Sequence, residues 1–258
     1  MNRSYRLPVL LLLAFGFAFA SRGADGPVYE LRTYTAAPGK LDALLARFRD
    51  HTCQLFEKHG MANVGYWVPL EGKDGAGEKL VYLLRHQSRA AAQASWKAFN
   101  ADPDWQAVRK ASEAAGKILA KNPEAVFLAT TDFSPVPGAN KAPGGAAPRL
   151  FEMRTYTAAE GKLAALDARF RDHTLALFVQ HGMTNVIYLH PLDADQGAGR
   201  TLVYFLAHAS REAATASWAA FRADPRWVKA KGDSEKAGKL TDKTESVLLV
   251  PTDFSALK

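Results

Sequence analysis

Apolar and polar residues follow two different periods in the first part of the chain. Residues 28–35 are rich in aromatic and β-branched side chains and lie between Pro27 and Pro38-Gly39, which predicts a strand. From Leu41 to Phe56 the apolar residues recur every three or four positions, which predicts an amphipathic helix. A strand followed by a helix of this kind is typical of a mixed α and β protein.

The following segments complete one structural unit. Three further strands are predicted, over residues 63–69, 80–86 and 124–130. A hairpin loop is expected over the glycine-rich residues 71–77. Ser88 is a predicted N-cap, and Pro103 is predicted to begin another helix that runs to about Leu119. The resulting order, β-α-β-β-α-β, is that of the ferredoxin-like split motif.

This unit is present twice. Residues 29–35 reappear with conservative changes at 151–157, which is an offset of 122 positions. The same offset relates residues 47–52 to residues 169–174. A period this long indicates a duplicated domain, because solenoid repeats are much shorter. We therefore predict a first domain at 27–134, a Pro/Gly-rich linker at 135–149 and a second domain at 150–256.

A single split unit leaves one face of its sheet without cover. The predicted strands are nevertheless apolar almost throughout, as residues 80–86 illustrate, which is typical of strands that are buried on both faces. We therefore expect an α+β fold in which two tandem ferredoxin-like domains pack sheet against sheet. The result would be an intrachain dimeric α/β barrel with the helices outside.

The N-terminus has the three-part pattern of a secretory signal peptide. Met1 to Arg6 is short and positive, and an apolar run follows that ends in Ala18-Phe19-Ala20. The run is shorter than the roughly 20 residues that a membrane-spanning helix needs. We predict that residues 1–20 are cleaved, that the mature chain begins at Ser21 and that the protein is periplasmic or secreted. The alternative is an uncleaved N-terminal anchor.

Composition excludes several classes of protein. The chain is 48% hydrophobic and 23% charged, as in ordinary globular proteins. Its formal charge is +7, but the lysines and arginines form no dense stripe, so we expect no nucleic-acid partner. The single cysteine, Cys53, excludes an intrachain disulfide and any cysteine-rich metal site. We interpret Cys53 as a small buried filler and not as a nucleophile.

Several short motifs suggest a family. Residues 29–34 with Pro38-Gly39-Lys40-Leu41, then residues 101–105 and 131–134, resemble the corresponding segments of NIPSNAP domains in order and spacing. The resemblance covers both copies and implies a dimeric α/β-barrel fold. It implies no reaction, because that family has none generally assigned. Relatives of this fold include cofactor-free monooxygenases, haem-degrading enzymes and chlorite dismutases, so the fold does not choose among functions.

Histidines are the first candidates for chemistry. Six of the seven are paired by the repeat: His51/His173, His59/His181 and His86/His208. We predict that His51 lies on the apolar stripe of its helix and points toward the sheet, beside a pocket. We predict that His86, at the end of a strand, lines a pocket mouth. In the alternative interpretation these are core histidines with hydrogen-bond partners, and His59 only interacts with the end of a helix.

The first strand carries a second group of candidates. Glu30, Arg32 and Tyr34 are two positions apart and therefore share one face. Arg32 and Tyr34 are predicted to meet an anionic or carbonyl ligand. Alternatively, Glu30 and Arg32 form a structural ion pair that meets Glu152 and Arg154 at the pseudo-two-fold axis. Trp96 is interpreted as either a pocket wall or a packing residue.

Together these candidates predict a duplicated ligand site between the first helix and the sheet of each copy. The candidate ligand-binding residues are Arg32, Tyr34, His51, His86, Trp96, Arg154, Tyr156, His173, His208 and Trp218. Metal-binding spacings and nucleophile motifs are absent from the sequence, so no metal and no cofactor are expected. A haem held by one histidine per domain needs no spacing motif and is the remaining alternative.

The preferred hypothesis is an exported protein that binds a small ligand or a protein partner, without an assigned reaction. One alternative is a cofactor-free enzyme of the monooxygenase type, in which a Tyr/His/Arg pocket activates the substrate. The other is a structural interaction module of the cell envelope. A pocket that holds both His51 and Tyr34 would favour the enzyme, and a tightly filled core would favour the interaction module.

Overall fold

Each half of the chain forms the predicted unit. The computed structural model describes residues 26–136 and 149–258, so the predicted signal peptide and most of the predicted linker lie outside the described residues. The first half contains β1 (Val28–Thr35), α1 (Leu41–Arg47), η1 (Phe48–Thr52), α2 (Cys53–Lys58), β2 (Ala62–Pro69), η2 (Gly72–Asp74), β3 (Lys79–His86), α3 (Arg89–Ala101), α4 (Pro103–Ser112) and β4 (Glu124–Thr130).

The second half repeats this order. It contains β5 (Leu150–Ala158), α5 (Leu163–Arg169), η3 (Phe170–Thr174), α6 (Leu175–Gln180), β6 (Thr184–Pro191), η4 (Ala194–Gln196), β7 (Thr201–His208), α7 (Arg211–Ala223), α8 (Pro225–Ser234) and β8 (Thr241–Pro251). Within the described residues, no helix is both long and apolar enough to cross a membrane.

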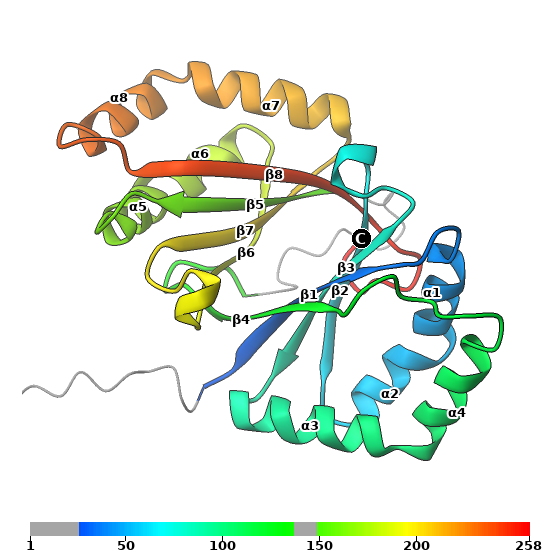
Figure 1. Ribbon diagram of the computed structural model, residues 1–258. Coiled ribbons are helices and arrows are strands. Elements are labelled where there is room, and N and C mark those ends of the chain that lie inside the picture. Colours follow the sequence, from blue (N-terminus) through cyan, green and yellow to red (C-terminus); the bar gives the residue numbers. More distant parts are fainter. Residues whose placement is uncertain (1–25, 137–148) are drawn as a thin grey trace, which may run out of the picture.

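The eight strands close into one antiparallel barrel in the order β1-β3-β2-β8-β5-β7-β6-β4. Two pairings join the halves: β2 with β8, where Val68 lies opposite Val250, and β4 with β6, where Ala129 lies opposite His190. Helices α1–α4 lie outside the first sheet and α5–α8 outside the second (Figure 1). The predicted intrachain dimeric α/β barrel is confirmed.

Side chains fill the interior of the barrel. Trp67 is 1% exposed, and its ring centroid lies 5.4 Å from that of Phe151 and 5.2 Å from that of Phe205. The opposite face of each sheet packs against its own helices, with Leu44 and Phe48 buried in the first half. Both faces of the strands are therefore covered, which is why their sequences are apolar almost throughout.

Each half also holds the other through the segment that follows its last strand. After β8, the backbone N–H of Thr252 donates to the carbonyl of Tyr66, and Ser255 Oγ accepts from the N–H of Tyr66 at 2.9 Å. Asp253 then pairs with Arg49 at 2.6 Å. After β4, Thr131, Asp132 and Ser134 make the corresponding contacts with Tyr188 and Arg171. The Thr-Asp-Phe-Ser motif therefore joins the two halves reciprocally.

One predicted helix ends earlier than expected. Helix α4 stops at Ser112 and does not continue to about Leu119. Gly116 has φ +106°, a left-handed conformation that residues with a side chain rarely adopt. The chain turns there, and residues 118–120 pair with the end of β1 instead of continuing the helix: the N–H of Ala37 donates to the carbonyl of Ile118, and the N–H of Ala120 donates to that of Thr35.

The predicted position of His51 is wrong. Residues 48–52 form a turn of π-helix, in which the N–H of Cys53 bonds the carbonyl of Phe48. The wider turn shifts the buried stripe by one position, so Thr52 is buried and His51 is exposed. The same turn at η3 exposes His173 in the second half.

Candidate functional site

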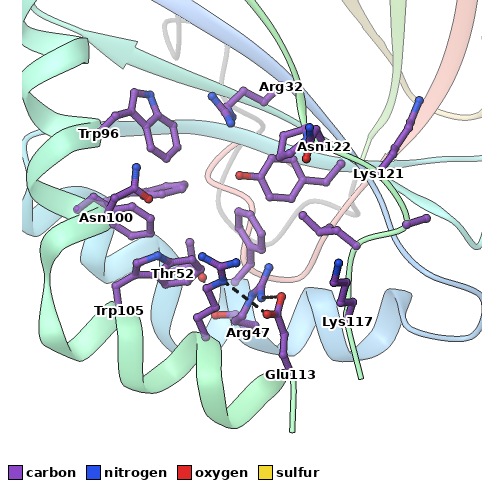
Figure 2. Close-up of a pocket in the computed structure, with 18 residues that line it drawn as sticks. Arg32, Arg47, Thr52, Trp96, Asn100, Trp105, Glu113, Lys117, Lys121 and Asn122 are labelled. Carbon is purple, nitrogen blue, oxygen red and sulfur yellow. Dashed lines mark hydrogen bonds and ion pairs between the residues drawn. The ribbon is translucent and has the colours of Figure 1, made fainter. Parts of the chain in front are cut away.

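A pocket of about 440 Å³ lies in the first half, between the sheet and the helices. Its wall consists largely of aromatic rings, contributed by Tyr34, Phe48, Phe56, Trp96, Phe99 and Trp105. Polar and charged residues complete the lining: Arg32, Arg47, Thr52, Asn100, Arg109, Glu113, Lys117, Lys121 and Asn122. Figure 2 shows Arg32 and Arg47 on opposite sides of this space. An apolar wall with a few polar groups is typical of a small-molecule site.

Arg32 is held in place from behind by a buried carboxylate. Glu30 is 1% exposed and accepts from Arg32 Nη1, from Trp96 Nε1 at 2.7 Å and from His86 Nε2 at 2.9 Å. Burial raises the pKa of Glu30, but the hydrogen bonds from His86, Trp96 and Arg32 and the charge of Arg32 outweigh it, so its pKa lies below the ordinary value. The carboxylate stays ionised and fixes both the guanidinium and the indole.

Arg32 also stacks on the pocket wall. Its guanidinium carbon lies 4.3 Å from the Trp96 ring centroid and 5.6 Å from that of Tyr34. Such contacts contribute about 0.5–2 kcal/mol each. Arg32 and Tyr34 of β1 and Trp96 of α3 therefore form one preorganised unit between the sheet and that helix.

Arg47 is the second cation, and it is more deeply buried. It is 5% exposed and lies 5.3 Å from the Trp105 ring centroid. Its Nη1 contacts Ser112 Oγ at 3.4 Å and Glu113 Oε1 at 3.6 Å. Burial lowers the pKa of Arg47 and the charge of Glu113 only partly opposes this, so the pKa lies below the ordinary value. The guanidinium is therefore a buried charge with weak compensation.

The second half contains the same cluster of a buried glutamate, an arginine and a tryptophan, with additional hydrogen bonds among its members. Glu152 accepts from Arg154, Trp218 and His208, and additionally from Ser246 Oγ at 2.6 Å. Arg154 Nη2 donates to the Tyr156 hydroxyl at 3.2 Å, and the guanidinium lies 4.3 Å from the Trp218 ring centroid. The predicted residues Arg154, Tyr156 and Trp218 are thus brought together as Arg32, Tyr34 and Trp96 are.

The buried arginine of the second half is also more tightly paired. Arg169 Nη1 lies 2.8 Å from Glu235 Oε1, whereas the equivalent distance from Arg47 to Glu113 is 3.6 Å. Lys231 contacts the same Glu235 carboxylate. The cationic groups of the first half are therefore more available to a ligand.

The predicted histidines do not line the first-half pocket. His51 and His173 are exposed and lie beside shallow grooves on the outer helical layer, each next to an aspartate. His86 and His208 are buried behind the sheet arginines and bonded to Glu30 and Glu152.

The predicted structural ion pair also differs from expectation. Glu30 pairs with Arg32, and Glu152 pairs with Arg154, each within its own half. Both pairs lie on the helix side of their sheet and not across the pseudo-two-fold axis.

His59 bonds Asp102, the N-cap of α4, at 2.6 Å. His59 therefore links two helices, in addition to lying at a helix end.

Burial raises the pKa of the half-buried Cys53 thiol to about 11, which disfavours the nucleophilic thiolate.

Sequence reasoning missed Arg47, Arg109, Glu113, Lys117 and Lys121. These residues come from α1, from α4 and from the segment after it, and only the tertiary structure brings them together. The repeat gave some indication of two of these residues, because Arg47 and Lys117 recur as an arginine and a lysine in the second copy.

The donor set does not fit a resident metal or haem in this pocket. Among the described residues, no cluster of three or more His, Cys, Asp and Glu side chains is placed to hold a metal ion. All seven histidines are described, and none of them lines the first-half pocket. A haem there would have no histidine as axial ligand, so that alternative is not supported.

A family model for NIPSNAP matches the chain twice, at residues 29–135 and 151–256. The chain belongs to the NIPSNAP family. The resemblance inferred from the motifs of the first strand and of the Thr-Asp-Phe-Ser segment is confirmed. No curated protein matches this NIPSNAP chain.

Solved structures of the same fold show what the NIPSNAP chain is similar to. A putative monooxygenase from Lactobacillus acidophilus is 11% identical with a TM-score of 0.54, covering 90% of this chain and 99% of its own. A putative monooxygenase from Fusobacterium nucleatum is 8% identical with a TM-score of 0.55, covering 88% and 92%. A NIPSNAP family protein of unknown function from Agrobacterium tumefaciens is 22% identical with a TM-score of 0.38, covering 43% and 95%. The likeness to the two putative monooxygenases, at TM-scores of 0.54 and 0.55, shows the dimeric α/β-barrel fold alone.

Proposed function

We propose that this protein is an exported small-molecule binding protein whose ligand occupies the first-half pocket. The observation that carries the proposal is the pocket itself: about 440 Å³, lined by six aromatic side chains and by the guanidinium groups of Arg32 and Arg47. This volume lies within the range of roughly 300–1,000 Å³ that is usual for small-molecule sites.

The pocket supports binding better than it supports the alternatives. It contains Tyr34 but not His51, so the Tyr/His/Arg constellation expected of the oxygenase is incomplete. The one carboxylate in its lining, Glu113, already contacts two guanidinium groups, at 3.6 Å from Arg47 and 3.5 Å from Arg109. The barrel interior is filled, as an interaction module requires, but the pocket lies outside the barrel and is open to ligand.

Blocking the pocket is expected to remove any ligand that co-purifies with the protein. Asn100 is exposed at the pocket mouth on α3, so Asn100→Trp should fill the entrance without disturbing the core. Native mass spectrometry of the gently purified full chain should show a small-molecule adduct that this variant lacks. Arg222→Trp changes the equivalent position of the second half and is the matched control. An adduct retained by Asn100→Trp would contradict the proposed site.

Export makes a separate prediction. The Ala18-Phe19-Ala20 sequence places cleavage before Ser21, so the protein isolated from its native cells should begin at Ser21. Intact-mass measurement with N-terminal peptide mapping checks this. Material that begins at Met1 would support the uncleaved anchor instead, and recovery in the cytoplasmic fraction would contradict export.

A further inference from the structure

The pocket has a strong bias in charge. Five cationic side chains line it, from Arg32, Arg47, Arg109, Lys117 and Lys121, and Glu113 is the single carboxylate among the lining residues. Two further carboxylates pair with these cations from outside the lining, Glu30 with Arg32 and Glu124 with Lys121, so the excess of positive charge rests on Arg47, Arg109 and Lys117. Arg109, Lys117 and Lys121 are exposed at its rim, where they attract an oppositely charged ligand. Arg32 and Arg47 lie inside, where solvent screens charge less effectively.

The two inner arginines have unused donors. Within the described residues, the Nε groups of Arg32 and Arg47 are buried and have no hydrogen-bond partner, and the same holds for Arg154 and Arg169, so the difference between the halves lies in their Nη groups. Glu30 occupies only Nη1 of Arg32, and Glu113 approaches Arg47 no closer than 3.6 Å. A buried donor without a partner costs about 1–3 kcal/mol, and more when it is charged. A ligand anion that accepts from the free Nη donors of these guanidinium groups supplies a counter-charge that the protein provides only in part.

The aromatic side chains around the two arginines determine which non-ionic part of a ligand fits the pocket. Trp96 stacks on Arg32, and Trp105 lies beside Arg47 with its ring centroid 4.5 Å from that of Phe99. Planar side chains on several sides favour a flat, apolar body. Carboxylate and phosphate are the groups whose geometry matches the donor fork of arginine.

We propose that the ligand of the first-half pocket is an aromatic organic anion, whose carboxylate or phosphate is bound by Arg47, while Arg32 on the opposite side of the pocket adds to the positive potential. This inference rests on the proposed function, because it names the chemical class that the same pocket takes. The second half is the weaker site. There Glu235 already pairs with Arg169 at 2.8 Å, and Tyr156 accepts from Arg154.

Four naphthalene probes of matched size test the charge class on the full mature chain by calorimetry. They are 2-naphthoate, 2-naphthyl phosphate, 2-naphthylmethanol and 2-naphthylmethylammonium. We expect the two anions to bind at least about tenfold more tightly than the neutral and cationic probes, the scale of charge-assisted hydrogen bonds. The stronger of the two anions identifies whether the natural group is a carboxylate or a phosphate.

Variants then assign the preference to the pocket. Arg47→Gln should weaken the binding of the two anions about tenfold or more and leave the affinity for 2-naphthylmethanol unchanged. The matched Arg169→Gln should have little effect on the affinity for any probe. Lys117→Ala alters an exposed side chain and is safe for folding, and it should weaken the anions about two- to threefold at low salt. These results together would support the inference.

Other outcomes overturn it. Equal binding of 2-naphthylmethanol and 2-naphthoate would refute the anionic class and leave the proposed small-molecule site intact. Anion binding that is lost in Arg169→Gln and kept in Arg47→Gln would place the site in the wrong half. Binding of none of the four probes would refute the aromatic-anion class. The comparison of the co-purifying adduct between wild type and Asn100→Trp tests the proposed function separately.

Discussion

Gly65→Ile is expected to destabilise the protein by about 3 kcal/mol or more, because the barrel interior has no room for a side chain at this position. A Cβ atom built on Gly65 would lie 2.2 Å from Cη2 and 2.4 Å from Cζ2 of Trp67. The indole cannot move aside, since Trp67 is 1% exposed and packs between Phe151 and Phe205. The variant must distort either the strand or the centre of the core.

The second half contains the compensating pair. At the positions of Gly65 and Trp67 it has Ile187 and Leu189, which are both buried in the same barrel core. The large ring over a glycine and two medium aliphatic side chains are therefore alternative ways to fill equivalent space. Gly65→Ile combined with Trp67→Leu recreates the second-half pair and should restore most of the lost stability.

Urea unfolding of the wild type, both single variants and the double variant measures this coupling. Trp67→Leu alone should also destabilise, because it leaves a cavity over the glycine. The double variant should be more stable than either single variant. A double variant as unstable as the sum of the two singles would show that the two halves do not fill their core by this exchange.

The strands could be predicted from the sequence because their signals are local. The boundaries of β1 follow from its apolar and β-branched residues between two turn signals, and the duplication gave each element a second occurrence. Pairing of the two sheets followed from the apolar character of strands such as β3, which one half alone cannot bury on both faces. These inferences needed no knowledge of side-chain contacts.

The position of His51 could not be predicted, because the π-helical turn at residues 48–52 changes the spacing of buried residues in the middle of the helix. A 3.6-residue periodicity places His51 on the buried stripe, and one additional residue in the turn moves Thr52 there. The site was predictable on β1, where the period of two puts Arg32 and Tyr34 on one face, and at Trp96 of α3, which was a candidate pocket wall and lines the pocket. Arg47 and Glu113 join them through helix packing, which leaves no local pattern.

Glu152→Gln is expected to cost about 3–5 kcal/mol at neutral pH, since it breaks a buried ion pair and leaves Arg154 without its counter-charge. Glu152 is 3% exposed and accepts from Arg154 at 2.5 Å, Ser246 at 2.6 Å, Trp218 at 2.7 Å and His208 at 3.0 Å. Glutamine keeps the shape but loses the charge and presents donors to other donors. The matched exposed control is Glu160→Gln, which should leave the free energy of unfolding unchanged.

The same carboxylate predicts how stability depends on pH. Burial raises the pKa of Glu152, but the hydrogen bond from His208, the charge of Arg154 and the hydrogen bonds from Ser246 and Trp218 lower it to about 2, from an ordinary value of 4.5. A group with a lowered pKa stabilises the fold above its unfolded pKa, and this contribution disappears as the pH falls through the folded pKa. Wild type should therefore lose about 3 kcal/mol from this group between about pH 4.5 and 2.

The difference in unfolding free energy between wild type and Glu152→Gln should accordingly be largest at pH 7 and shrink steadily below pH 4.5. Urea unfolding at pH 7, 4 and 3 measures it, with Glu160→Gln as the exposed control. Glu30→Gln should behave similarly, because Glu30 also has a lowered pKa, although Ala125 stands where Ser246 supplies a fourth donor in the second half. A difference that stays constant from pH 7 to pH 3 would mean that the Glu152 carboxylate is not the ionised centre of its cluster, and that Arg154 is fixed by its contacts with Trp218 and Tyr156.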